Sequence, residues 1–130
     1  MFLSNNETTT VTTKQIINAC FTTHNELGTG FLEKVYQEAL SIIFQEEGII
    51  YEREKHLPIM FRGKLIACDY IADYVIDNKI ILEIKAVKEL EPIHEAQVVN
   101  YLKATGYQIG LLVNFGSEKL QIRRLASNIY

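Results

Sequence analysis

The chain of 130 residues contains only two cysteines, Cys20 and Cys68, and they do not form a CxxC pair. This spacing argues against a disulfide framework or a cysteine-ligated zinc site, so we expect two reduced, buried thiols. No apolar run approaches the ~18 residues that a membrane-spanning helix needs. The N-terminus also lacks the basic and apolar regions of a secretory signal. We therefore expect a cytoplasmic protein with no membrane partner.

An excess of positive charge is also absent. The sequence has 13 Lys and Arg residues against 16 Asp and Glu residues, which gives a formal net charge of −3. Without a global positive field, any binding to nucleic acid must use a local basic patch. A site that gathers several carboxylates would itself contribute to the acidity.

Repeats, low-complexity tracts and linkers are absent too, which leaves one folding unit. The hydrophobic share of 48% and charged share of 22% are those of an ordinary globular protein. Residues 4–8 are polar, and we expect residues 1–8 to form a flexible lead, followed by a single domain over residues 9–130.

Hydrophobic periodicity and turn residues divide this domain into helices and strands. Two helices come first, interrupted by a glycine-containing break at 27–30, and a third begins at Pro92 and ends at Gly106. Helices are predicted at 10–25, 31–47 and 91–106, and strands at 49–55, 57–61, 65–76, 79–87, 107–115 and 119–125. Pro58 suggests a break after the first strand, whose second part either continues or restarts it. The order predicts an α/β fold around one mixed sheet.

The strand at 79–87 carries Glu83 and Lys85 between apolar residues on both of its faces. A strand that is apolar on both faces is normally central in its sheet, where an unpaired charge costs several kcal/mol. Two alternatives remain at this point. Glu83 and Lys85 are either an ordinary surface pair on an edge strand or a functional acid and amine inside the sheet.

The turn before this strand brings a second acid into register. If residues 77–79 form a three-residue loop, Ile76 pairs with Ile80 and Asp73 lies directly opposite Glu83. Two like charges at opposed positions repel, and a divalent cation between them reverses the sign of that interaction. We therefore predict an Mg²⁺ or Mn²⁺ site at Asp73 and Glu83. Lys85 would lie beside the ion, where it orients a water or stabilises negative charge on a phosphate.

The second predicted helix presents another acid. Glu33 shares a face with Tyr36, Gln37 and Leu40. Glu33 is either a third carboxylate aimed at the metal or a first-turn acid that complements the helix dipole. Its position alone does not separate the two.

The third helix carries long polar side chains on one face, because His94, Gln97 and Tyr101 follow an i, i+3, i+7 spacing. Such side chains are able to reach a phosphate or base beside the metal. In the alternative interpretation, His94 is a polar residue of the helix start and Tyr101 is a core ring with its hydroxyl at the surface.

Together these residues resemble the GxxExxY proteins, a bacterial and archaeal group in the PD-(D/E)XK nuclease-like superfamily. The resemblance begins with Gly30, Glu33 and Tyr36 and covers residues 10–125. It continues through the segments 72–73, 82–86, 96–102 and 110–116. One departure is Ala72, which stands where the pattern has a proline.

The resemblance implies a restriction-endonuclease-like fold, a mixed sheet flanked by helices in the order α-α-β-β-β-α-β-β. It implies that Asp73 and Glu83 are metal ligands, with Glu33 and the Ile84 carbonyl as further ones, and that Lys85 is the catalytic lysine. Gln97 and Tyr101 correspond to the Q-xxx-Y element, and we expect them to bind substrate together with Tyr36.

The expected function is a metal-dependent phosphodiesterase that acts on DNA or, as the less favoured substrate, RNA. One alternative is a non-catalytic nucleic-acid-binding or regulatory module that keeps the nuclease fold. A further alternative is a homodimer, or a subunit of a larger assembly in which a partner recognises the nucleic acid.

Overall fold

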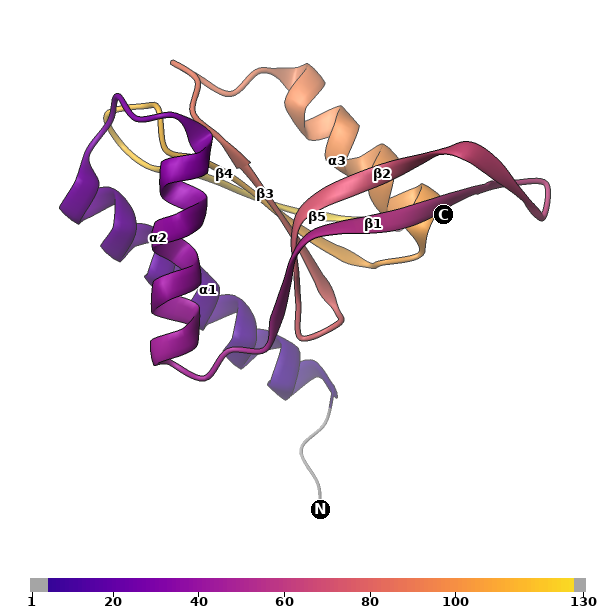
Figure 1. Ribbon diagram of the computed structural model, residues 1–130, viewed down its shortest axis with the longest axis horizontal. Coiled ribbons are helices and arrows are strands. Elements are labelled where there is room, and N and C mark those ends of the chain that lie inside the picture. Colours follow the sequence, from indigo (N-terminus) through magenta and orange to yellow (C-terminus); the bar gives the residue numbers. More distant parts are fainter. Residues whose placement is uncertain (1–4, 128–130) are drawn as a thin grey trace.

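A computed structural model of the protein, shown in Figure 1, describes residues 5–127, with side chains from residue 13 onward. The order of its elements is α-α-β-β-β-α-β-β, as predicted, and the expected mixed α/β fold is confirmed. The elements are α1 (Asn5–Leu27), α2 (Glu33–Glu46), β1 (Tyr51–Phe61), β2 (Lys64–Ile76), β3 (Ile80–Lys85), α3 (Pro92–Thr105), β4 (Ile109–Asn114) and β5 (Gln121–Ala126).

The sheet of the described chain has five strands in the order β1-β2-β3-β4-β5. β3 and β4 run parallel, and the other neighbours are antiparallel. Parallel neighbours require a crossover connection, and α3 supplies it. β3 is therefore the central strand, and its residues from Ile80 to Ile84 are buried. This placement confirms the prediction that Glu83 belongs to the interior of the sheet.

Helices cover both faces of the sheet, and each face has its own apolar core (Figure 1). On one face α1 and α2 pack against alternate residues of β3, such as Leu82 and Ile84. On the other face α3 packs over a second core that includes Ile81. A Cβ atom at Gly110 of β4 would lie 2.9 Å from Cγ1 of Val98, so a glycine is needed for α3 to approach this closely.

The ribbon formed by β1 and β2 rotates between Ala72 and Tyr74. Residues two apart in a regular strand share a face, yet Tyr74 packs in the first core and Ala72 in the second. On β1 the position facing Asp73 is Glu54, whose φ of 49° lies in the left-handed region that non-glycine residues seldom adopt. Asp73 is therefore located at the point where the ribbon turns over.

Several boundaries differ from the sequence prediction. β1 is one strand that continues through Pro58, with a register irregularity between Pro58 and Met60. An edge strand accommodates a proline because its outer N–H groups need no ladder partner. α1 begins at Asn5 rather than near residue 10, and residues 1–4 of the predicted lead lie outside the described residues.

The two cysteines are free thiols, as predicted. Cys20 is buried, but Cys68 is exposed, because it lies on the part of β2 that extends beyond the sheet. Burial raises the pKa of the Cys20 thiol, which keeps it protonated. Among the described residues, no helix is long and apolar enough to cross a membrane.

Candidate functional site

The predicted hairpin register between β2 and β3 is confirmed, with Ile76 opposite Ile80 and Tyr74 opposite Leu82. The next step along both strands brings Asp73 to Glu83. At this point the two carboxylates, and not backbone carbonyl groups, accept hydrogen bonds from the backbone N–H groups. The Asp73 N–H donates to Oε2 of Glu83 at 3.0 Å, and the Ile84 N–H donates to Oδ2 of Asp73 at 2.7 Å. The rotation of the ribbon separates β2 from β3, so the N–H groups of Asp73 and Ile84 have no backbone partner on the opposite strand. The two carboxylates accept their hydrogen bonds instead.

Glu83 is the more buried of the two acids, with 9% of its surface exposed. Its Oε2 also accepts a hydrogen bond of 2.5 Å from the Tyr70 hydroxyl. Burial, followed by the charge of Asp73, raises the pKa of Glu83 to about 7, although the hydrogen bonds and the Lys85 charge oppose this. The fold therefore disfavours the ionised form of Glu83.

Asp73 is half-buried, and its pKa is also raised. Burial is the largest cause, and the nearby charge of Glu33 adds to it. The hydrogen bond from the Ile84 N–H and the charge of Lys85 act in the opposite direction. Lys85 thus lies close enough for its charge to favour the ionised form of both acids.

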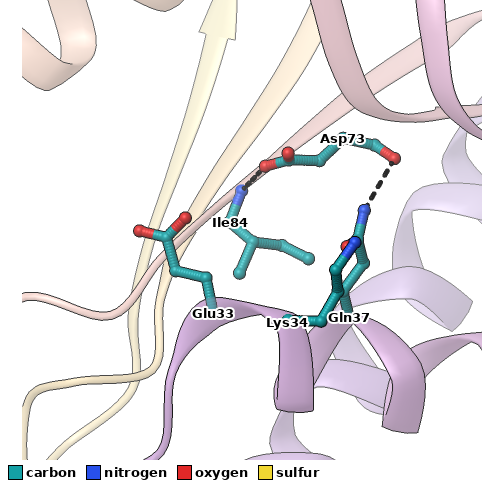
Figure 2. Close-up of a pocket in the computed structure, with 5 residues that line it drawn as sticks. All are labelled: Glu33, Lys34, Gln37, Asp73 and Ile84. Atoms are coloured by element: carbon teal, nitrogen blue, oxygen red, sulfur yellow. Dashed lines mark hydrogen bonds between the residues drawn. The ribbon is translucent and has the colours of Figure 1, made fainter.

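The Asp73 carboxylate faces a cleft of about 260 Å³ between α2 and the sheet (Figure 2). Glu33, Lys34, Gln37 and Ile84 line the cleft with it. Figure 2 shows the Glu33 side chain rising from the start of α2 on the same side as Ile84. The Gln37 amide donates to the Asp73 carbonyl at 3.4 Å and ties α2 to β2. The cleft therefore offers acidic, basic and amide groups beside the buried pair.

The three predicted acids do not form one cluster. Within residues 13–127, no group of three or more His, Cys, Asp or Glu side chains is placed to hold a metal ion. Glu33 lines the cleft with Asp73, while Glu83 lies against Tyr70 on the side of the second core.

Two carboxylates nevertheless fit Mg²⁺ or Mn²⁺, because these ions often use one or two carboxylates and complete their shell with waters and phosphate. The hydrogen bonds to Glu83 fall on Oε2, and the bond to Asp73 falls on Oδ2. Each acid keeps a second oxygen for a ligand.

Tyr70 is a site residue that the sequence did not indicate. Its hydroxyl donates to Glu83, and its ring stacks on Tyr101 of α3 at a centroid distance of 3.7 Å and an angle of 10°. Burial and the charge of Glu83 raise the pKa of Tyr70, so the hydroxyl remains a donor. In a regular strand, Tyr70 and Asp73 point to opposite faces. Only the rotation between Ala72 and Tyr74 brings Tyr70 to Glu83, and no sequence spacing reveals it.

The residues predicted on α3 occupy different environments. Gln97 is exposed, as a substrate contact requires. Tyr101 is half-buried and contacts the acidic pair through Tyr70. The Nδ1 atom of His94 accepts a hydrogen bond of 2.9 Å from the Glu91 N–H, and this closes a capping box at the helix start. His94 is therefore a helix-start residue, which is one of its two predicted interpretations.

Tyr36, predicted to bind substrate, is fully buried. Its hydroxyl donates to the Gly28 carbonyl at 2.6 Å, and its ring stacks on Phe115 at 4.7 Å. A fully buried ring cannot contact a substrate, so the structure does not support the predicted role of Tyr36. Tyr36 instead fixes the loop that precedes α2, and with it the position of Glu33.

Comparison with known proteins points in the same direction as the geometry. A family model described as the PD-(D/E)XK nuclease superfamily matches residues 10–125. No curated protein matches the chain by sequence.

Two solved structures share the fold. The crystal structure of SSO0001 superposes with a TM-score of 0.57 at 19% identity, over 75% of this chain and 50% of that one. An alkaline exonuclease, LHK-Exo from Laribacter hongkongensis, superposes with a TM-score of 0.53 at 16% identity, over 73% of this chain and 56% of that one. The chain thus spans about half the length of these proteins, and the shared part is the restriction-endonuclease-like sheet with its flanking helices.

Proposed function

Because the chain belongs to the PD-(D/E)XK nuclease superfamily, we propose that it is a metal-dependent phosphodiesterase that cleaves DNA or, as the less favoured substrate, RNA. Within the superfamily we assign it to the GxxExxY proteins, on the strength of Gly30, Glu33 and Tyr36. The observation that carries the proposal is the pair of adjacent acids, the buried Glu83 and the half-buried Asp73, beside Lys85.

The raised pKa values of both acids support a cation site. Burial and mutual repulsion make the doubly ionised pair unfavourable in the protein alone. A divalent cation between the two carboxylates removes their repulsion and replaces the solvation that they lose on burial. Binding of the cation therefore makes the doubly ionised pair favourable. Nucleases of this superfamily generally use divalent metals, and Mg²⁺ or Mn²⁺ suits carboxylate ligands.

In the proposed site Asp73 and Glu83 would hold the ion, with the Ile84 carbonyl as a further ligand. Glu33, on the rim of the cleft, would contribute directly or through a water. When bound, the ion would supply Lewis-acid chemistry that polarises the phosphate and lowers the pKa of a coordinated water. Lys85 orients the attacking water and stabilises the negative charge that develops on the phosphate. Gln97 contacts the substrate, and Tyr101 supports Glu83 through Tyr70.

Cleavage assays with matched variants test this proposal. Single-stranded DNA, duplex DNA and RNA are incubated with Mg²⁺, Mn²⁺ or EDTA. Asp73→Asn and Lys85→Ala are each expected to reduce the cleavage rate by about 100-fold or more, the scale on which catalytic side chains act.

Glu118→Gln and Lys14→Ala are matched controls, since Glu118 is exposed between β4 and β5 and Lys14 is exposed on α1. Both controls should cleave at the wild-type rate. Equal cleavage by the wild type, Asp73→Asn and Lys85→Ala would mean that a contaminant is responsible and that the proposal is wrong.

A second function is favoured by one observation, the separation of Glu33 from Glu83, which leaves no three-acid cluster among the described residues. Under this alternative the fold binds nucleic acid as a regulatory module and does not cleave it. Salt-dependent DNA binding by the wild type, without metal-dependent cleavage of any of the three substrates, would establish the alternative.

A further inference from the structure

From Asp73 toward the turn that joins β1 and β2, β2 no longer pairs with β3. There β1 and β2 continue as a two-stranded ribbon. Residues 58–69 form this ribbon, here called the β1–β2 arm. β2 pairs with β3 only from Tyr74 to Ile76, so the arm is held together by pairing between β1 and β2. Every residue from 60 to 69 is exposed. Figure 1 shows the arm projecting from the body of the protein, with its turn at the far end.

The arm concentrates positive charge on an acidic protein. The charged residues of the arm are Arg62 and Lys64 beside its turn and Asp69 at its base, where Asp69 pairs with His56, so the arm carries a net charge of +1. Subtracting this charge from the net charge of −3 leaves −4 on the rest of the chain. Neither Arg62 nor Lys64 takes part in the ion pairs found between described residues. The tip of the arm is therefore positively charged, whereas the rest of the chain has a net negative charge and repels a polyanion.

The arm also exposes large apolar side chains. Met60, Phe61, Leu65 and Ile66 are 48%, 62%, 67% and 40% exposed, respectively. The guanidinium of Arg62 lies over the Phe61 ring, 5.5 Å from its centre. This combination of apolar and cationic side chains suits a surface that meets base edges and backbone phosphates together.

We propose that the β1–β2 arm enters the major groove of duplex DNA and holds the substrate at the proposed nuclease site. This inference rests on the proposed function and names double-stranded B-form DNA as its substrate. The major groove of B-DNA, about 12 Å wide, admits a two-stranded β-ribbon, whereas the major groove of A-form RNA is too narrow for side chains to read. Single-stranded DNA offers no groove.

A second copy of the chain fits the arm less well than DNA does. In a two-fold symmetric contact the same surface faces itself. Two arm tips meeting in this way would bring Arg62 and Lys64 of both copies together, and like charges repel. The phosphates that flank a DNA groove neutralise these charges instead.

The geometry of the arm predicts where it touches the DNA. Lys64 lies nine positions before Asp73 on the same strand. At about 3.3 Å per residue, the tip is about 30 Å from the acidic pair, which is close to one turn of the double helix, or about 10 base pairs. The substrate must therefore extend as duplex for about 10 base pairs to one side of the cleaved phosphate.

A binding experiment without catalysis tests the arm. Binding of a 30-base-pair duplex is measured in EDTA, as a function of salt, for the wild type and for the double variant Arg62→Gln/Lys64→Gln. Loss of two phosphate contacts should reduce the slope of log K against log salt by about 2 and weaken binding at 0.1 M salt by about 60-fold. The double variant Lys14→Gln/Lys119→Gln removes two exposed charges elsewhere and should bind as the wild type does.

Several results would overturn the proposal. They are wild-type affinity in the Arg62/Lys64 double variant, absence of duplex binding by the wild type, and equal binding of duplex DNA, duplex RNA and single strands. Light scattering that shows a dimer abolished by Leu65→Asp, with DNA affinity unchanged, would assign the arm to a second copy instead.

Because binding is measured in EDTA, failure of the arm and failure of the nuclease proposal remain distinct. Loss of duplex binding in the Arg62/Lys64 variant supports the arm even if the wild type cleaves nothing. Conversely, a wild type that cleaves with Mn²⁺, and an arm variant that cleaves and binds equally well, would keep the nuclease and remove the arm.

Discussion

Replacing Glu83 by glutamine should stabilise the metal-free protein at alkaline pH, even though it removes a residue of the proposed site. Both hydrogen bonds to Glu83, from the Tyr70 hydroxyl and the Asp73 N–H, fall on Oε2. A glutamine carbonyl oxygen in the same position retains both bonds. What the substitution removes is a buried negative charge next to Asp73.

The magnitude follows from the pKa of Glu83, which the fold raises from 4.5 to about 7. At 1.4 kcal/mol for each pH unit between the two values, the ionised side chain costs the folded protein about 3 kcal/mol. Below pH 4.5 Glu83 is protonated in both the folded and the unfolded chain, so it costs nothing. The cost grows as the pH rises from 4.5 to about 7 and is complete above that. The free energy of unfolding of Glu83→Gln should therefore exceed that of the wild type by about 3 kcal/mol at pH 8.

Urea unfolding followed by circular dichroism, in EDTA at several values between pH 5 and pH 8, measures this difference. In thermal unfolding the same energy corresponds to about 10 °C in Tm for a chain of this length. Asp69→Asn, at an exposed acid of the neighbouring strand β2, is the control and should stay within about 0.5 kcal/mol of the wild type. A Glu83→Gln variant no more stable than the wild type at pH 8, or equally more stable at pH 5 and pH 8, would refute the reasoning.

Three further predictions concern the ion, the tyrosines and the helix packing. At pH 8, Mn²⁺ at about ten times its Kd should stabilise the wild type by about 1.4 kcal/mol, and thermal unfolding should show no such gain for Glu83→Gln or Asp73→Asn. Tyr70→Phe removes the hydroxyl that donates to Glu83, so it should lower kcat while KM stays unchanged. Tyr101→Phe keeps the ring stack and should retain wild-type kcat. A raised KM in Tyr101→Phe would show that its hydroxyl touches substrate instead. Gly110→Ala should cost about 1–3 kcal/mol in urea unfolding, because its Cβ would collide with α3 at 2.9 Å, and an unchanged midpoint would contradict the close packing.

The parts of this site that the sequence predicts are those set by local rules. A three-residue turn at 77–79 determines the register of the hairpin, and alternation along β3 determines which residues share the face of Glu83. The apolar residues on both sides of Glu83 predict a central strand, as the sheet order confirms. The helix breaks at Gly106 and before α2 are equally local.

The parts that it does not predict depend on tertiary packing. The rotation of the ribbon between Ala72 and Tyr74 places these two residues of β2 in different cores, and no periodicity in the strand predicts it. Tyr70 becomes a partner of Glu83 only through that rotation. Tyr36 shares a helix face with Glu33, but packing against Phe115, which follows β4, buries Tyr36 while Glu33 remains exposed. Helical spacing alone does not distinguish these two positions.

The claim that Asp73 and Glu83 share a divalent ion is tested most directly by anomalous diffraction from crystals soaked in Mn²⁺. We predict an anomalous peak within bonding distance, about 2.2 Å, of one oxygen of each acid, and its loss from crystals of Asp73→Asn. Manganese bound only elsewhere on the protein, or a peak unchanged in Asp73→Asn, would contradict the account.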